Sequence, residues 1–361
     1  MAVGESLPPR LTAVLRRWGV QFSWIAVAAV LPLAPFLADA PLALRYAPFV
    51  ASVVVFGFPH GAVDHLVPDR LGDASRRRSL ALVGVLYAVL GGLYTGWWFF
   101  APVSAFGFFI LLTWAHWGQG DLYALLRFVD ADHLPTRAER VLAAVVRGGL
   151  PMLVPLVAFP TAYREVAAAL VGLFTDQPLP PLFGPTAQTA VGLGFGAVSL
   201  LAVTLGGVRV VRGAARRPWL VDASEVALLW LYFLAVPPVL AIGLYFCFWH
   251  ATRHLARLAL IDDAPPDATA TGPTDALLGA GRGARTALAS GDLGGALRKL
   301  ARDATPMSVG GLVIVGLVLV AAPRAAAGAE GLLAVYLVGI AVLTLPHVAV
   351  VTWMDLRQGV W

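Results

Sequence analysis

Cysteine and charge are both scarce in this chain, and each scarcity excludes a class of protein. With Cys247 as its single cysteine, the chain forms no intrachain disulfide and no cysteine-based zinc site, so a metal would need nitrogen or oxygen ligands. Only 13% of the residues are charged, whereas soluble domains average about 25%. Lysine occurs once, at Lys299, so the net charge of +5 rests on arginines in short segments between apolar runs. This distribution is typical of a membrane protein's topology signal and argues against a nucleic-acid partner.

Hydrophobic residues make up 59% of the chain and gather in long apolar runs. The runs predict an all-α fold, a polytopic transmembrane helical bundle of about eight to ten helices. We expect a single integral-membrane domain over residues 1–361. Arginine-rich segments precede the first run and follow the second, sixth and eighth, which predicts a multi-pass protein of the cell membrane with both termini cytoplasmic. Residues 262–305 are expected to form a mobile cytoplasmic loop with at most one amphipathic helix, near residues 285–300.

Two histidines four residues apart lie inside one apolar run, in the segment Tyr245-Phe-Cys-Phe-Trp-His250-Ala-Thr-Arg-His254. A helix places residues i and i+4 one above the other, so both imidazoles can bind one metal ion. Such side chains at membrane depth are costly unless they are paired or liganded, which favours a functional site. The alternative is that each histidine only hydrogen-bonds a neighbouring helix.

Three further histidines lie in other apolar runs, at His60, His116 and His347. They and the pair all fall on even-numbered predicted helices, each at the middle or in the cytoplasmic half. Five histidines at one depth, on helices of one polarity, are expected to converge on one centre. His133, in a mixed-charge segment between runs, is instead expected to be a solvated loop residue.

His60 and His65 project about 140° apart on a regular helix, so only one of them can serve a given ion. We expect the deeper His60 to be the ligand, with Asp64 on its face, and His65 to support the site or the packing. Asp121 is expected to accept an imidazole N–H from a ligand, as carboxylates around metal sites commonly do, or else to pair with an arginine. His347 follows a proline that frees a backbone carbonyl, and we expect it to bond that carbonyl or a substrate, with metal ligation as the less favoured alternative.

The predicted ligands are therefore four imidazoles, from His60, His116, His250 and His254. Zinc, copper and ferrous iron all accept such ligands. Zinc would fill its shell with four nitrogens and be structural, whereas iron takes up to six ligands and keeps open positions. The open positions favour Fe(2+) and an oxygen-using enzyme that acts on a membrane-dissolved substrate.

The chain resembles the Brp/Blh family of integral-membrane carotenoid oxygenases, found beside microbial rhodopsins, in four motifs that follow in the same order. The motifs are Phe-Pro-His60-Gly-Ala-Val-Asp64-His65, His116-Trp-Gly-Gln-Gly-Asp121, Trp-His250-Ala-Thr-Arg-His254 and Pro-His347. An extra N-terminal helix and the segment 262–305 depart from shorter members.

The resemblance implies a definite reaction, in which O₂ cleaves β-carotene at its central 15,15′ double bond to give two molecules of retinal. The reaction takes place at a non-haem iron held by His60, His116, His250 and His254. A microbial opsin is the implied acceptor of retinal, and the lipid bilayer is the implied source of substrate.

Three other functions stay open. A membrane desaturase or hydroxylase also uses histidine boxes, but those boxes include adjacent histidine pairs, and this chain has seven histidines and no adjacent pair. A haem-binding electron carrier would use histidines of facing helices as axial ligands. A non-catalytic carotenoid or retinal carrier that assists opsin maturation would need an apolar cavity and no metal.

Overall fold

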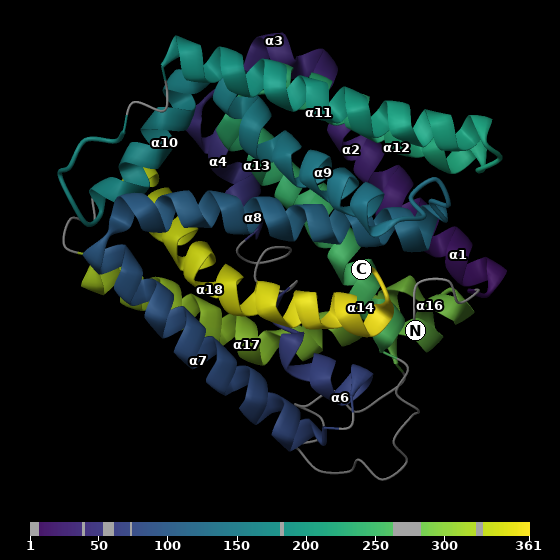
Figure 1. Ribbon diagram of the computed structural model, residues 1–361. Helices are drawn as coiled ribbons and strands as arrows, with labels where there is room; N and C mark the ends of the chain where they lie inside the picture. The colour runs from purple at the N-terminus through teal and green to yellow at the C-terminus, as the bar shows by residue number, and fades with distance from the viewer. Residues whose placement is uncertain are drawn as a thin grey trace.

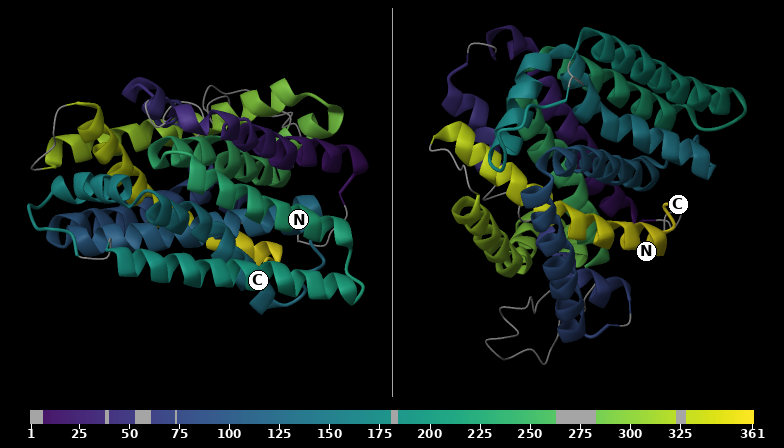
Figure 2. Two further views of the ribbon diagram at one scale, coloured as in Figure 1. Left: turned by 90° about the horizontal axis from the view of Figure 1, so that it is seen from above. Right: turned by 60° about the vertical axis from the view of Figure 1, so that its left-hand side comes forward.

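The computed structural model describes residues 7–37, 40–52, 61–72, 74–180, 184–262, 283–322 and 328–361. These residues form helices and no strand, which confirms the predicted all-α class. Figures 1 and 2 show the helices packed as a bundle in which α8 runs through the middle.

The N-terminal third begins with a helical stretch and ends with two long helices. Its elements are α1 (Pro9–Arg16), η1 (Arg17–Gln21), α2 (Phe22–Ala28), η2 (Leu31–Leu33), α3 (Ala34–Leu37), α4 (Leu42–Ala51), η4 (Asp64–Leu66), α6 (Val67–Leu71), α7 (Arg76–Phe100) and α8 (Pro102–Ala124), which continues into η5 (Leu125–Val129).

The remainder of the chain contains the other helical elements, both long and short. They are α9 (Arg137–Ala158), α10 (Pro160–Gly172), α11 (Pro185–Val211), α12 (Arg216–Ala235), α13 (Pro238–Tyr245), η6 (Phe246–His250), α14 (Ala251–Ile261), α16 (Ala284–Ser290), α17 (Leu293–Ala321) and α18 (Ala329–Gln358). The elements α13, η6 and α14 follow one another without a break, and η1, η5 and η6 are π-helical turns.

Within the described residues, seven helices are long and apolar enough to cross a membrane. They are the stretch Pro9–Leu37 and helices α7, α9, α11, α12, α17 and α18, the last counted from Glu330. Helix α8 and the stretch from α13 to α14 are of similar length, but they carry polar side chains that are buried inside the bundle. The protein is therefore a helical membrane protein whose more polar helices lie at its centre.

The beginnings of the helices follow from local sequence. Pro102, Pro160, Pro185 and Pro238 each occupy the first helical position, where a missing N–H costs nothing. Helix α9 begins with a capping box, in which Thr136 and Glu139 satisfy each other's backbone N–H groups.

Residues 263–282 of the predicted loop lie outside the described residues, but its part from Gly283 onward differs from the prediction. Helix α16 lies within it, and α17 begins at Leu293 and continues through Pro306 as one helix to Ala321. Its N-terminal half packs inside the protein, since Lys299 and Asp303 are buried and form an ion pair with each other. The expected amphipathic helix is therefore the first part of a transmembrane-length helix.

The two ends of the described chain lie at the same end of the bundle (Figure 1), because Leu11 of α1 and Val360 belong to one hydrophobic cluster. The prediction that both termini are cytoplasmic requires this shared position.

Helices α8 and α9 pack backbone against backbone. A Cβ atom added at Gly118 would overlap the carbonyl of Ala144, and one added at Gly148 would overlap the carbonyl of Trp114. Glycine at both positions is therefore a requirement of the contact between these two central helices.

Gly148→Ala is expected to lower the free energy of unfolding by about 1–3 kcal/mol, because the added methyl group forces the two backbones apart. Unfolding of the purified protein in detergent, followed by circular dichroism, measures the change. Gly196→Ala on α11 is the matched control, because a Cβ there meets no atom within 4 Å. Equal stability of the two variants would contradict the close contact.

Candidate metal centre

Four buried histidines from three separate helical stretches meet at one place. His116 comes from α8, His250 and His254 from η6 and α14, and His347 from α18. The Nε2 atoms of His116 and His250 are 3.0 Å apart. The ring centroid of His347 lies 4.7 Å from that of His116 and 5.1 Å from that of His254. The expected convergence is confirmed for these four histidines, whereas His60 lies outside the described residues.

The local structure of the η6–α14 stretch sets the direction of the histidine pair. Its two rings are nearly parallel, with an interplanar angle of 11° and centroids 6.3 Å apart, as expected for side chains stacked along one helix face. His250 ends the π-helical turn η6, and such turns frequently occur at functional sites because they redirect a side chain within a helix. Both rings therefore point toward α8 and α18.

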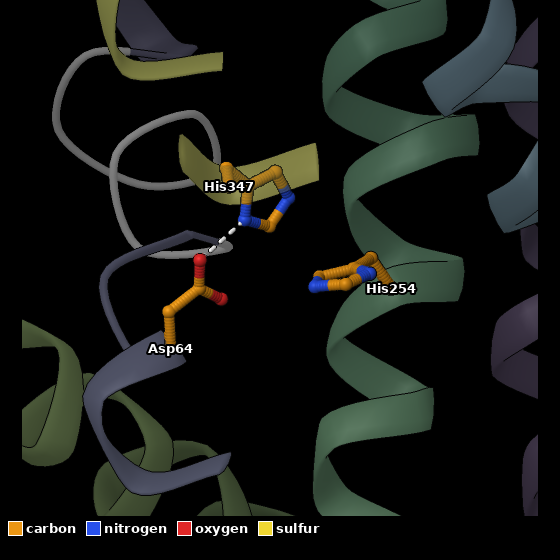
Figure 3. Close-up of side chains that lie close together, drawn as sticks. All are labelled: Asp64, His254 and His347. Carbon is orange, nitrogen blue, oxygen red and sulfur yellow. Dashed lines mark hydrogen bonds and ion pairs between the residues drawn. The ribbon is translucent and has the colours of Figure 1, made fainter. Parts of the chain in front are cut away.

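Asp64 approaches the cluster from the opposite side, at the start of η4 (Figure 3). Its Oδ2 lies 2.7 Å from Nδ1 of His347 and accepts a 2.7 Å hydrogen bond from the Tyr87 hydroxyl. Asp64, His254 and His347 offer ligand atoms that all lie within 4.8 Å of one another. A proton on Nδ1 of His347 leaves its Nε2 as the nitrogen that can bind a metal.

The chemistry of the side chains and one short distance in the cluster are compatible with a metal site. Nε2 of His116 and Nε2 of His250 are 3.0 Å apart, which is close enough for two ligands of one ion and is also the length of a hydrogen bond between the two rings. Neutral imidazoles with a carboxylate beside them suit ferrous iron, copper or zinc, and the residues present therefore fit such an ion.

His65 lies outside this cluster. It is buried, and its Nδ1 lies 3.0 Å from the carbonyl oxygen of Ala62 in its own turn. This contact agrees with the expectation that His65 points away from the centre and supports the local packing.

Among the described residues, Asp121 accepts no imidazole N–H, so the first of its two predicted roles is not found there. Its carboxylate accepts hydrogen bonds from the Trp249 indole and ion-pairs with Arg147 at 3.1 Å and with Arg253 at 3.3 Å. Asp121 and His116 project about 140° apart around α8, so they face different neighbours. The second role, pairing with arginine, is the one that the structure contains.

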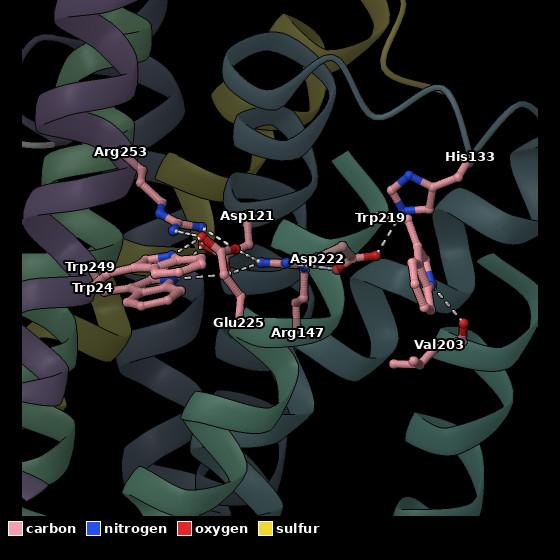
Figure 4. A network of polar contacts seen from close by, with 10 residues as sticks. All are labelled: Trp24, Asp121, His133, Arg147, Val203, Trp219, Asp222, Glu225, Trp249 and Arg253. Carbon is pink, nitrogen blue, oxygen red and sulfur yellow. Dashed lines mark hydrogen bonds and ion pairs between the residues drawn. The ribbon is translucent and has the colours of Figure 1, made fainter. Parts of the chain in front are cut away.

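Asp121 belongs to a buried ionic network that sequence reasoning missed (Figure 4). Glu225 of α12 accepts hydrogen bonds from Arg147, Arg253 and the Trp24 indole. The signal in the sequence was a set of charged residues inside apolar runs, but their pairing depends on which helices are neighbours. The network joins α2, α8, α9, α12 and α14, and Arg253 fixes α14 between its two histidines.

His133 closes the other end of this network, which corrects the prediction that it is a solvated loop residue. It is 1% exposed, and its Nε2 lies 3.0 Å from Asp222, which also ion-pairs with Arg147 at 2.7 Å. The segment before α9 folds back onto α12, so a residue between two helices becomes buried.

An apolar cavity of about 440 Å³ begins at the histidines, and His116 and His347 form part of its wall. This volume is within the usual range of small-molecule sites, about 300–1,000 Å³. The α18 residues that line it extend from Leu333 to His347, about 21 Å at the rise of a helix. Thr113, one turn before His116, is buried in this wall, and its hydroxyl has no hydrogen-bond partner among the described residues.

These features define a helical membrane protein with a buried histidine centre at the end of a long apolar cavity. The chain belongs to the family described as beta-carotene 15,15′-dioxygenase, which matches residues 51–355. The family expected from the four sequence motifs is thereby confirmed.

Named relatives extend over most of the chain. It is 43% identical to the probable beta-carotene 15,15′-dioxygenase Blh of Halobacterium salinarum, over 98% of this chain and 97% of the relative. It is 32% identical to the probable beta-carotene 15,15′-dioxygenase Brp of the same species, over 89% of this chain and 86% of the relative. A beta-carotene 15,15′-dioxygenase of the uncultured marine bacterium 66A03 is 24% identical over 57% of this chain and 67% of its own length. No solved structure matches the chain.

Arg253→Met is expected to destabilise the protein by about 3–5 kcal/mol, because it leaves the buried carboxylates of Asp121 and Glu225 with Arg147 as their remaining cation. Thermal unfolding in detergent measures this loss. Arg298→Met, at an exposed position of α17, is the control and is expected to change stability by less than about 0.5 kcal/mol. Wild-type stability of Arg253→Met would mean that the network contributes little to the fold.

Proposed function

We propose that this protein cleaves β-carotene at the central 15,15′ double bond with O₂ to give two molecules of all-trans-retinal. The proposal places a non-haem ferrous iron at the histidine cluster. The observation that carries it is the meeting of four buried imidazoles, two of which line an apolar cavity, in a chain of the beta-carotene 15,15′-dioxygenase family. A carrier would need the cavity, but it would gain nothing from four buried imidazoles that are costly to place in an apolar interior.

Three of the four proposed iron ligands, His116, His250 and His254, lie in the cluster, and His60 is retained from the sequence motif. His347 is as close to the other rings as His254 is, so we add it to the candidate ligands. Ferrous iron, when bound, supplies the capacity to react with O₂. Asp64 orients His347 through its Nδ1, and Tyr87 donates to the same carboxylate oxygen.

The remaining work of the site is to bind and align an apolar chain. Phe109, Trp117 and Phe246 line the cavity beside the histidines, and their burial excludes water from the reacting double bond. Binding follows from the burial of apolar surface, at roughly 25 cal/mol per Å². Because Leu333 and His347 line opposite ends of the α18 wall, a rod-shaped molecule along α18 has one part at the histidines and the rest in the apolar cavity.

The proposal also includes the source of the substrate, the orientation of the protein in the membrane and the acceptor of the product. The lipid bilayer of the cell membrane is the source of the substrate, both termini are cytoplasmic, and a microbial opsin receives the retinal. The shared position of the two chain ends supports this topology.

His250→Ala is expected to lose both iron and retinal formation, because it removes the Nε2 atom that is proposed to bind the iron beside Nε2 of His116. Iron analysis of the purified protein should give about one ion per chain in the wild type and a small fraction of it in the variant. His65→Ala is the matched control, since this buried histidine bonds its own turn, and it should keep its iron. Full iron occupancy in His250→Ala would remove His250 from the shell, and retinal binding without any cleavage would favour a carrier.

Asp64→Asn is expected to weaken iron affinity or turnover by about 10-fold to 100-fold and to be rescued in metal content by excess iron. The physical reason is that the amide still reaches His347, but it no longer offers a charged acceptor. An iron titration that reads bound metal and retinal measures both quantities. If Asp64→Asn stays as metal-free as His254→Ala at saturating iron, the carboxylate is itself a ligand.

A further inference from the structure

Within the part of the chain that the structure describes, the wall of the metal-centre cavity is exposed at one place. Among the described residues that line it, the exposed ones are Gly84, Ala88 and Gly310. Gly84 and Ala88 are one turn apart on α7, and Gly310 lies on α17. All other described lining residues are buried or half-buried. The cavity therefore opens between α7 and α17, at a position framed by residues with little or no side chain.

Helices α7 and α17 lie at the outside of the bundle. In their apolar stretches only 22% and 17% of the residues are buried, compared with 56% in α9 and 61% in α18. Both pack against α18 and lie on the same side of it (Figures 1 and 2). An opening between two peripheral, membrane-length helices faces lipid acyl chains rather than water.

A second apolar cavity, of about 280 Å³, continues from this opening along the same two helices. It shares Tyr87, Ala88, Ile314 and Leu343 with the wall of the first cavity. Its own wall extends along α7 from Gly91 to Phe99, and Leu317 in that wall is 62% exposed. The two cavities thus adjoin at the level of Tyr87, whose hydroxyl contacts Asp64 beside the histidines.

We propose that an apolar polyene dissolved in the bilayer enters the metal centre sideways through this opening, and that the smaller cavity is the site where it first binds. The opening defined by Gly84, Ala88 and Gly310 is called the α7–α17 mouth. The occupant is the carotenoid substrate, so this inference rests on the proposed function. Its basis is the continuity of the two cavities and the absence of polar side chains among the described residues at the mouth, which matches a hydrocarbon chain.

Leucine placed in the mouth should slow substrate entry without touching the metal. A Cβ at Gly84 or at Gly310 meets no atom within 4 Å, so Gly84→Leu, Gly310→Leu and the double variant add bulk without an immediate clash. Gly96→Leu and Gly316→Leu are matched controls. They lie on the same two helices, have equally open surroundings and line neither cavity.

Each iron-loaded variant is assayed in two ways. In the first, the enzyme meets O₂ and vesicles of phosphatidylcholine containing β-carotene at the same time. In the second, the enzyme is equilibrated with the vesicles without oxygen, and O₂ is then added for a single turnover. The mouth variants should lose about tenfold in initial rate in the first assay and keep the wild-type rate constant in the second. The controls should match the wild type in both, and all variants should hold equal iron.

Three results would contradict substrate entry through the α7–α17 mouth. The first is an unchanged initial rate in the double variant, and the second is an equal loss of initial rate in the two control variants. The third is an equal loss of rate in the preloaded reaction, which would indicate an effect on the chemistry. If iron-loaded wild type makes no retinal, the proposed function fails instead. The uptake of β-carotene from vesicles by the oxygen-free protein, read from its absorbance, then still tests the mouth, because uptake must be slower in the double variant than in the controls.

Discussion

A polar side chain inside an apolar bundle must find its partner within the protein, because neither lipid nor apolar side chains can solvate it. This constraint accounts for both polar clusters of the structure. The arginines and carboxylates around Arg147 satisfy one another as ion pairs. The imidazoles of His116, His250, His254 and His347 gather at one centre, where a metal ion would be their natural common partner.

The two clusters share helices, which ties stability to the proposed chemistry. Helix α8 carries His116 toward one cluster and Asp121 toward the other. Arg253 lies between His250 and His254 in the chain and is held by Asp121 and Glu225. Any movement of α14 that would displace the histidine pair must therefore break buried ion pairs. A network of this kind is costly to build but holds its helices in one arrangement, and here that arrangement brings imidazoles from three helical stretches together.

The outer helices have the opposite character. Helices α7 and α17 carry Gly84, Ala88 and Gly310 at the mouth, and few of the residues in their apolar stretches are buried. The protein is thus closely packed where α8 and α9 meet through Gly118 and Gly148. It is more loosely packed at the α7–α17 mouth, where the proposed substrate would enter. Under the proposed function, a rigid centre with a small-residue mouth would suit a substrate that stays in the bilayer.

The sequence by itself determined the helical membrane class, the pairing of His250 with His254 and the family, because hydropathy, the i to i+4 spacing and four ordered motifs are local properties of the chain. It also predicted that the histidines of separate helices would share a centre, from their common depth. Only the tertiary structure decided which neighbours each polar residue meets. Asp121 forms ion pairs with Arg147 and Arg253. His133 is buried against Asp222, and His347 contacts Asp64. The physical reason is that depth along a helix can be read from one segment, whereas the rotation and contacts of that helix depend on all the segments that pack around it.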